Sequence, residues 1–307
     1  MSKRIKVLCA LVSVYVLWGG TYLGIRLAVQ TIPPFLMGGI RFLVAGGAVY
    51  LYARATGAAR PRREHWRDAG ITSGLLLLGG NGMVCWAEQL VPSGIAALMA
   101  GTVPLWMLVL GFLGRARARP SVLTLGAILL GFAGIALLAL PGGGSGRIQP
   151  VGFAALVAGS LLWSLGSLYS RRARVPASPL LSVSLQMILG GALMLLASLL
   201  LGEWPRLDLA RVTTRSLLGM GYLVLFGSIV AFSAYIWLLK NADTTWVSTY
   251  AFVNPIVALF LGFVLAGEQL TAHAMWATGI ILGSVVVITV NRSREASAIR
   301  RRSSSPS

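Results

Sequence analysis

Residues 17–47, LWGGTYLGIRLAVQTIPPFLMGGIRFLVAGG, decide the fold of this chain. The pattern predicts two apolar helices joined by a tight turn at Pro33 and Pro34, with Arg41 inside the second helix. An arginine at membrane depth is costly unless it is paired or faces water, so an intramembrane arginine is a functional-site candidate by default. We therefore expect Arg41 to have a role in function.

The same stretch recurs in the second half of the chain. At a spacing of 145 positions the matched pairs are Trp18 with Trp163, Pro34 with Pro179, and Arg41 with Gln186. At a spacing of 151 positions they are Trp86 with Trp237, Pro104 with Pro255, and Gly111 with Gly262. These matches predict two copies of one unit, residues 1–145 and 146–290, followed by a basic disordered tail over 291–307.

The composition is that of an integral membrane protein. Hydrophobic residues make up 56% of the chain and charged residues 11%, whereas soluble domains carry about 25% charged residues. The mean hydropathy is +0.80. The net charge of +18 is scattered through short loops and the tail rather than clustered on one surface, so it predicts no nucleic-acid partner.

Ten apolar segments are each long enough to cross about 30 Å of hydrocarbon at 1.5 Å per residue. Their expected limits are 6–26, 35–53, 69–90, 93–113, 121–140, 150–170, 180–201, 215–238, 246–266 and 272–290. The first segment follows three basic residues and resembles a signal peptide, but it is too long and lacks a small-residue cleavage site. We expect it to be retained.

The positions of Lys and Arg predict the orientation. The amino-terminal side and every second loop after it carry 20 of the 26 basic residues, and the opposite side carries 5. Basic short loops stay in the cytoplasm, so both termini are predicted to be cytoplasmic. Nine or eleven spans would break the alternation.

An odd number of helices in each copy means that the second copy enters the membrane from the opposite face. The predicted fold is therefore an all-α integral membrane protein of ten transmembrane helices, arranged as a 5+5 inverted repeat around a central cavity. This is the architecture of secondary transporters, which bind a small-molecule substrate near the midplane.

Two charged residues are expected to meet near the outer boundary. Arg41 lies about 9 Å below that boundary in segment two, and Glu88 lies close to it at the end of segment three. We hypothesise that they form a charged pair, either a gate that opens on separation or on protonation of Glu88, or a static structural pair. Arg26, at the outer end of segment one, is a rival partner for Glu88.

Further polar and aromatic residues are predicted to line the cavity, because they share helix faces at similar depths. The expected substrate pathway comprises Trp18, Tyr22, Arg41, Asn81, Glu88, Trp163, Gln186, Tyr250 and Asn254. Aromatic rings and amides suit an amphipathic or aromatic solute, although each aromatic residue can equally serve helix packing. Pro104 and Pro255 remove helix hydrogen bonds and are predicted hinges of segments four and nine.

Several strings resemble a known family, and the resemblance covers all ten segments. They are LWGGTYLGIR, PPFLMGGIRF, GNGMVCWAEQLVPSGIAAL, GTVPLW and YAFVNPIVALFLGFVLAGEQLT. They are similar to the EamA family of the drug/metabolite transporter superfamily, and most closely to its YedA-type inner-membrane exporters. The resemblance implies export of metabolites, amino acids or toxic small molecules from the bacterial cytoplasm, and a location in the bacterial inner (plasma) membrane. The family's Gly-Glu pair after the fourth helix is present at Gly267 and Glu268, but the first half has Gly114 and Arg115.

Other functional classes are weighed against this one. The sequence offers no nucleophile with a base and no metal-ligand cluster, so we expect no enzyme, no metal and no cofactor. A channel or lipid scramblase with a polar pathway remains an alternative, and so does a non-transporting membrane scaffold. The protein is expected to be a monomer or a homodimer, with the basic tail contacting membrane lipid head groups.

Overall fold

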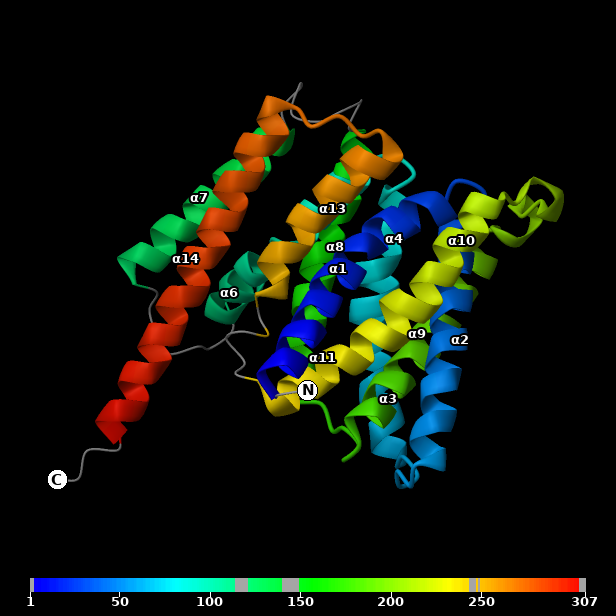
Figure 1. Cartoon of the computed structure of the whole chain (residues 1–307), viewed down its shortest axis with the longest axis horizontal. Helices are drawn as coiled ribbons and strands as arrows, with labels where there is room; N and C mark the ends of the chain where they lie inside the picture. Colours follow the sequence, from blue (N-terminus) through cyan, green and yellow to red (C-terminus); the bar gives the residue numbers. More distant parts are fainter. Residues whose placement is uncertain (1–2, 114–120, 140–148, 243–246, 248, 304–307) are drawn as a thin grey trace.

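The structure of the chain is a computed structural model that describes residues 3–113, 121–139, 149–242, 247 and 249–303. Its regular elements are helices throughout these ranges (Figure 1). In the first half they are α1 Lys3–Ala28, α2 Pro34–Ala55, α3 Arg63–Ser73, the π-helix η1 Gly74–Asn81, α4 Gly82–Ala87, α5 Ser93–Ala100, α6 Val103–Leu113 and α7 Val122–Ala139. In the second half they are α8 Pro150–Ser170, α9 Pro179–Leu200, the short 3-10 helices η2 Trp204–Arg206 and η3 Leu209–Arg211, α10 Thr214–Tyr222, the π-helix η4 Leu223–Val230, α11 Ala231–Asn241, α13 Tyr250–Ala266 and α14 Ala272–Ser303.

These elements form the ten predicted spans. Eight of them are long and apolar enough to cross a membrane, and two shorter apolar helices, Val122–Leu138 and Tyr250–Ala266, occupy the positions of segments five and nine. Both shorter helices adjoin stretches outside the described residues. Helix α1 begins and α14 ends at the same end of the bundle (Figure 1), as an even number of spans requires.

Prolines and glycines set the helix boundaries. Pro34, Pro150 and Pro179 are each the first residue of their helix, where the missing N–H costs nothing because it would have no partner within the helix. The chain leaves α9 through Gly202 and α13 through Gly267, both with positive φ, 65° and 66°. Glycine takes this backbone conformation without steric cost, so both helices end sharply.

Helix packing follows the pseudo-twofold symmetry that the repeats predict. Helix α1 packs against α10, η4, α11 and α13, which form the eighth and ninth spans. Its counterpart α8 packs against α3, η1, α4, α5 and α6, which form the third and fourth spans. Repeat mates also pack on each other, including α2 with α9 and α7 with α14 (Figure 1). Each half therefore packs on the other in the same way.

Glycines bring α2 and α9 into close antiparallel contact. A Cβ on Gly46 would lie 2.7 Å from Cβ of Met187, and one on Gly39 would lie 2.7 Å from Cγ of Leu195. Gly39 contacts Leu195, and Gly46, later in α2, contacts Met187, earlier in α9. The two helices therefore run in opposite directions. Small residues permit this approach, since van der Waals packing rather than the hydrophobic effect drives helix association in lipid.

Both halves contain a π-helix at the same place. The third span holds η1 and the eighth span holds η4, each eight residues long and starting 149 positions apart. Gly80 of η1 lies against Trp163 of α8, and Gly227 of η4 lies against Thr21 of α1. Single π-turns inside helices are rare and occur often at functional sites. Their recurrence indicates that the two halves share detailed backbone geometry.

The fourth span is interrupted rather than kinked. Helix α5 ends at Ala100, and α6 begins at Val103, so Pro104 is the second residue of a new helix and not a mid-helix kink as the sequence suggested. Two carbonyls on either side of the break also accept hydrogen bonds from α8: Ser160 Oγ donates to Met99 O at 3.0 Å and Ser164 Oγ to Val103 O at 3.2 Å. Serine hydroxyls commonly satisfy broken helices in this way. Pro255, in contrast, lies inside the continuous helix α13.

Candidate functional site

Arg41 lies between the two halves and is almost fully buried. Its side chain projects from α2, is 4% exposed, and donates from Nε to Ser228 Oγ of η4 at 3.1 Å. The guanidinium carbon also lies 4.7 Å from the centroid of the Phe42 ring. In the described part of the chain, the Nη1 atom has no hydrogen-bond partner. Arg41 therefore keeps an unused donor in a buried position.

Glu88 follows the last residue of α4 and is completely buried. Both of its carboxylate oxygens lack a hydrogen-bond partner among the described residues. Arg26 donates to the backbone oxygen of Glu88, not to its carboxylate. Arg41 interacts with Glu88 electrostatically, but no ion pair joins them within the described ranges. The Arg41–Glu88 ion pair that the sequence suggested is therefore absent from the described residues in this conformation.

Two predicted aromatic residues meet between α1 and the second half. The rings of Trp18 and Tyr250 are 5.1 Å apart between centroids, and Phe232 and Tyr235 of α11 each lie 5.1 Å from Trp18 as well. Trp18 Nε1 donates to Gly227 O of η4 at 3.0 Å. The sequence analysis did not single out Phe232 or Tyr235, although their position one turn apart on one helix face is a signal that could have found them.

The remaining mid-depth residues pack at helix contacts. Asn81 accepts a hydrogen bond from Cys85 Sγ at 3.4 Å, and Tyr22 packs against the largest apolar cluster. The amide nitrogen of Asn254, in the orientation that satisfies its neighbours, donates to the backbone oxygens of Tyr250 at 3.1 Å and Tyr15 at 3.2 Å. The contact of Asn254 with Tyr15 and the packing of Trp163 against Gly80 join the first helix of each half to a span of the other half.

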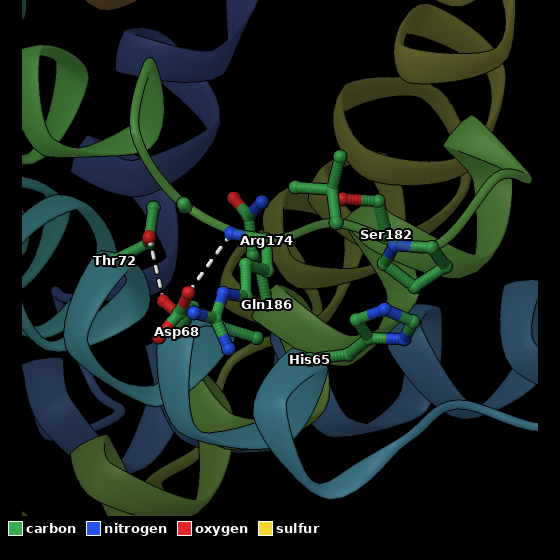
Figure 2. Close-up of a pocket in the computed structure, with 10 residues that line it drawn as sticks. His65, Asp68, Thr72, Arg174, Ser182 and Gln186 are labelled. Atoms are coloured by element: carbon green, nitrogen blue, oxygen red, sulfur yellow. Dashed lines mark hydrogen bonds between the residues drawn. The ribbon is translucent and has the colours of Figure 1, made fainter.

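A hollow lies at one end of the bundle, between α3, the segment that follows α8 and the start of α9 (Figure 2). The space between its walls is about 190 Å³, which includes volume open to solvent. Gln186 is the predicted pathway residue on its wall, together with His65, Asp68, Thr72, Arg174 and Ser182.

Asp68 holds this end of the bundle together, and the sequence analysis missed it. The carboxylate is nearly buried and accepts from Arg67 Nε at 2.9 Å, Arg174 N at 2.8 Å and Tyr169 Oη at 3.3 Å. Arg174 Nη1 also pairs with Glu64 at 2.8 Å. Helix α3 of the first half is thus tied to the segment between α8 and α9 of the second (Figure 2). The available signal was an acidic residue within a loop otherwise rich in arginine.

At the opposite end, two glutamates of the second half cap helices of the first half. Glu203 accepts from the backbone nitrogens of Phe35 and Leu36 at 3.3 and 2.8 Å. Glu268 accepts from Ser93 N and Ser93 Oγ, both at 2.8 Å, and from Gly94 N at 3.2 Å. Each glutamate directly follows a glycine with positive φ. Arg115, where the first half lacks the family's glutamate, falls outside the described residues.

The fold and these buried polar groups define a multi-pass membrane protein made of two inverted halves, in which Arg41 and Glu88 keep polar atoms without hydrogen-bond partners among the described residues. The model of the EamA-like transporter family matches residues 5–140 and 150–290. The chain therefore belongs to this family and is a membrane transporter rather than an enzyme.

Similar proteins agree with this assignment. The inner membrane transporter YedA of Escherichia coli K12 is 38% identical over 284 residues, covering 92% of this chain and 90% of YedA. The transporter YvbV of Bacillus subtilis is 22% identical over 286 residues, which are 92% of each chain. A crystal structure of a protein that is 21% identical shares the fold, with a TM-score of 0.60 over 94% of this chain and 98% of the other.

Proposed function

We propose that this transporter exports small metabolites, amino acids or amphipathic aromatic compounds from the bacterial cytoplasm by alternating access. The observation that carries the proposal is the repeated pairing of elements across the pseudo-twofold axis, in which α1 and α8 make corresponding contacts with the opposite half. Two halves related in this way can exchange conformations. When each half takes the conformation of the other, an inward-facing state becomes an outward-facing state.

The two ends of the bundle are closed by different contacts, which supports alternate opening. One end is held by Glu203 and Glu268 on helix N-termini, and the other by Asp68 and Glu64 on the segment that contains Arg174. All four contacts join one half to the other. Opening one end therefore requires only the loss of its own set of polar contacts, while the other set stays in place.

The break in the fourth span gives the motion a hinge. A Cβ on Gly101, the residue that follows α5, would lie 3.1 Å from Cγ of Pro255 in α13. The predicted hinges Pro104 and Pro255 thus belong to two spans in direct contact near the axis. Backbone breaks at such positions absorb rotation at low cost, because few hydrogen bonds have to change.

The solute class follows from the side chains of the proposed pathway. Trp18 and Tyr250 offer aromatic faces for stacking, and Arg41 offers an unused donor. An aromatic ring bearing a polar or charged substituent can use both kinds of contact. We place the protein in the inner (plasma) membrane with cytoplasmic termini, supported by the basic loops and by the similarity to YedA.

A tolerance screen tests this function. Cells that overproduce the protein are exposed to a panel of aromatic and cationic compounds, and growth is compared with Arg41→Ala and with Arg54→Ala as a control on the exposed end of the same helix. We expect protection by the wild type and by Arg54→Ala, and at least partial loss in Arg41→Ala at equal protein levels.

Flux measurements separate a carrier from the other classes. A compound that scores in the screen should show saturable efflux and counterflow from reconstituted vesicles. Unsaturable flux without counterflow would favour a channel, lipid redistribution alone would favour a scramblase, and no flux of any compound would contradict transport. Protection that survives Arg41→Ala would remove Arg41 from the pathway.

A further inference from the structure

Three buried or half-buried carboxylates of this protein are fully supplied with hydrogen-bond donors. Asp68 accepts from three groups, Glu203 from two backbone nitrogens, and Glu268 from two backbone nitrogens and a hydroxyl. A carboxylate removed from water needs such donors, because an unpaired buried charge is strongly unfavourable. In this fold, a carboxylate that stays ionised away from water therefore accepts at least two hydrogen bonds.

Glu88 departs from this pattern. It is 0% exposed, the most deeply buried of the four, and neither oxygen has a donor in the part of the chain that the structure describes. Arg26 directs Nη1 to the backbone oxygen of Glu88 and not to its carboxyl group. A neutral carboxylic acid tolerates this environment far better than a carboxylate does. The geometry therefore fits a protonated Glu88 in this conformation.

The groups around Glu88 can favour either protonation state. Helix α1 contributes Tyr22 and the cation Arg26, α2 contributes the cation Arg41, and Cys85 lies one turn back on α4. The anion Glu268 acts from the segment after α13. Helix α8 also packs beside Glu88, because its Gly152 contacts Leu90 and Val91. This helix contains no charged residue. Arg41 carries a buried Nη1 donor without a partner among the described residues, so its approach would stabilise the carboxylate.

We propose that Glu88 is the proton-binding site that couples solute export to proton entry. This inference rests on the proposed function and adds its driving force. In the conformation seen here, Glu88 carries the proton. When the cytoplasmic end opens, the carboxyl releases its proton to the cytoplasm, and the carboxylate then accepts a hydrogen bond from Arg41 Nη1 while the solute binds. After the protein opens outward and releases the solute, Glu88 takes a proton from the outside. The protonated, solute-free protein then returns to the inward-facing state, so one proton crosses inward for each solute exported.

Infrared spectroscopy of the reconstituted protein tests the proton site without any solute. We expect a protonated-carboxyl band at neutral pH that disappears in Glu88→Gln and that the wild type loses as the pH is raised. Glu203→Gln is the matched control, because Glu203 is also buried but has two N–H donors; the band should remain. A band unchanged in Glu88→Gln, or no such band in the wild type, would overturn the proposal.

Vesicles loaded with ethidium, a flat aromatic cation, test the coupling. Exchange of one proton for one ethidium ion is electroneutral, so an internally acid gradient of one pH unit should drive about tenfold accumulation. Glu88→Gln should keep ethidium counterflow and lose the accumulation, whereas Asp208→Asn, on an exposed loop, should keep both.

Counterflow with no response to the pH gradient would refute the coupling but leave export standing. A wild type that moves neither ethidium nor any other compound of the screen would instead refute export, and the infrared band would still decide whether Glu88 holds a proton.

Discussion

Glu203 provides the most direct test of how the two halves are held together. Helix α2, which carries Arg41, begins after Pro33, and proline has no side-chain acceptor to cap a helix. The N–H groups of Phe35 and Leu36 therefore depend on the carboxylate of Glu203, which is 4% exposed. We predict that Glu203→Ala destabilises the protein by leaving both N–H groups unsatisfied and a helix N-terminus without its anion.

The magnitude follows from the two hydrogen bonds. Each bond to a charged acceptor contributes about 1.5–3 kcal/mol, and imperfect geometry at 3.3 Å in one of them places the total near the lower end. We expect a loss of about 3–4 kcal/mol for Glu203→Ala and roughly half of that for Glu203→Gln, whose amide oxygen can still accept one bond. At about 2 °C per kcal/mol for a large chain, the alanine variant should melt about 6–8 °C lower.

Thermal unfolding of the purified protein in detergent measures this effect. Asp208→Ala is the control, because Asp208 lies five residues further on, is half exposed and pairs with Arg211 on the surface; it should cost less than about 1 kcal/mol. Equal melting temperatures for Glu203→Ala and Asp208→Ala would refute the claim that a glutamate of the second half caps α2.

Three further substitutions test other contacts. In Gly80→Ala the new Cβ would lie 2.8 Å from Trp163 Cε3, so we expect a loss of about 1–3 kcal/mol, whereas Gly279→Ala, which meets no atom within 4 Å, should be neutral in the same melting assay. Ser164→Ala leaves the carbonyl of Val103 without the donor that reaches it across the helix break, and we expect it to cost about 1 kcal/mol and to speed hydrogen exchange near the break. Asp68→Asn weakens the contacts to the segment before α9; labelling of Gln186→Cys in a background without Cys9 and Cys85 should become faster, and an unchanged labelling rate would show that Asp68 does not close this end.

Much of the fold could be predicted from composition and repetition. Segment length and hydropathy located ten spans, because every residue in lipid must satisfy its backbone within a helix and must present an apolar side chain. The spacing of Trp18 and Trp163, and of Pro34 and Pro179, revealed the duplication. The odd number of spans in each half then required inversion. These inferences depend on local chemistry and on counting, and they need no knowledge of which helix touches which.

The candidate site was predicted only in part. The sequence identified Arg41 and Glu88 as buried charges on neighbouring spans, and the structure places them within electrostatic reach. It could not show that Nη1 of Arg41 and both oxygens of Glu88 lack partners, because pairing depends on side-chain direction and on small shifts between helices. The sequence also predicted that Pro104 lies within a continuous helix. It could not show the break at Gly101 and Thr102, because the serines of α8 that stabilise this break are distant in the chain.

By itself, the sequence determined that this chain lies in a membrane, that it has ten spans, and that its halves are inverted copies, since these properties follow from hydropathy and periodicity along the chain. The tertiary structure alone decided which charges are paired. Asp68, Glu203 and Glu268 find their donors on the other half of the protein, and Glu88 finds none among the described residues. Such partners are set by the packing of helices far apart in sequence, and no local pattern encodes that packing.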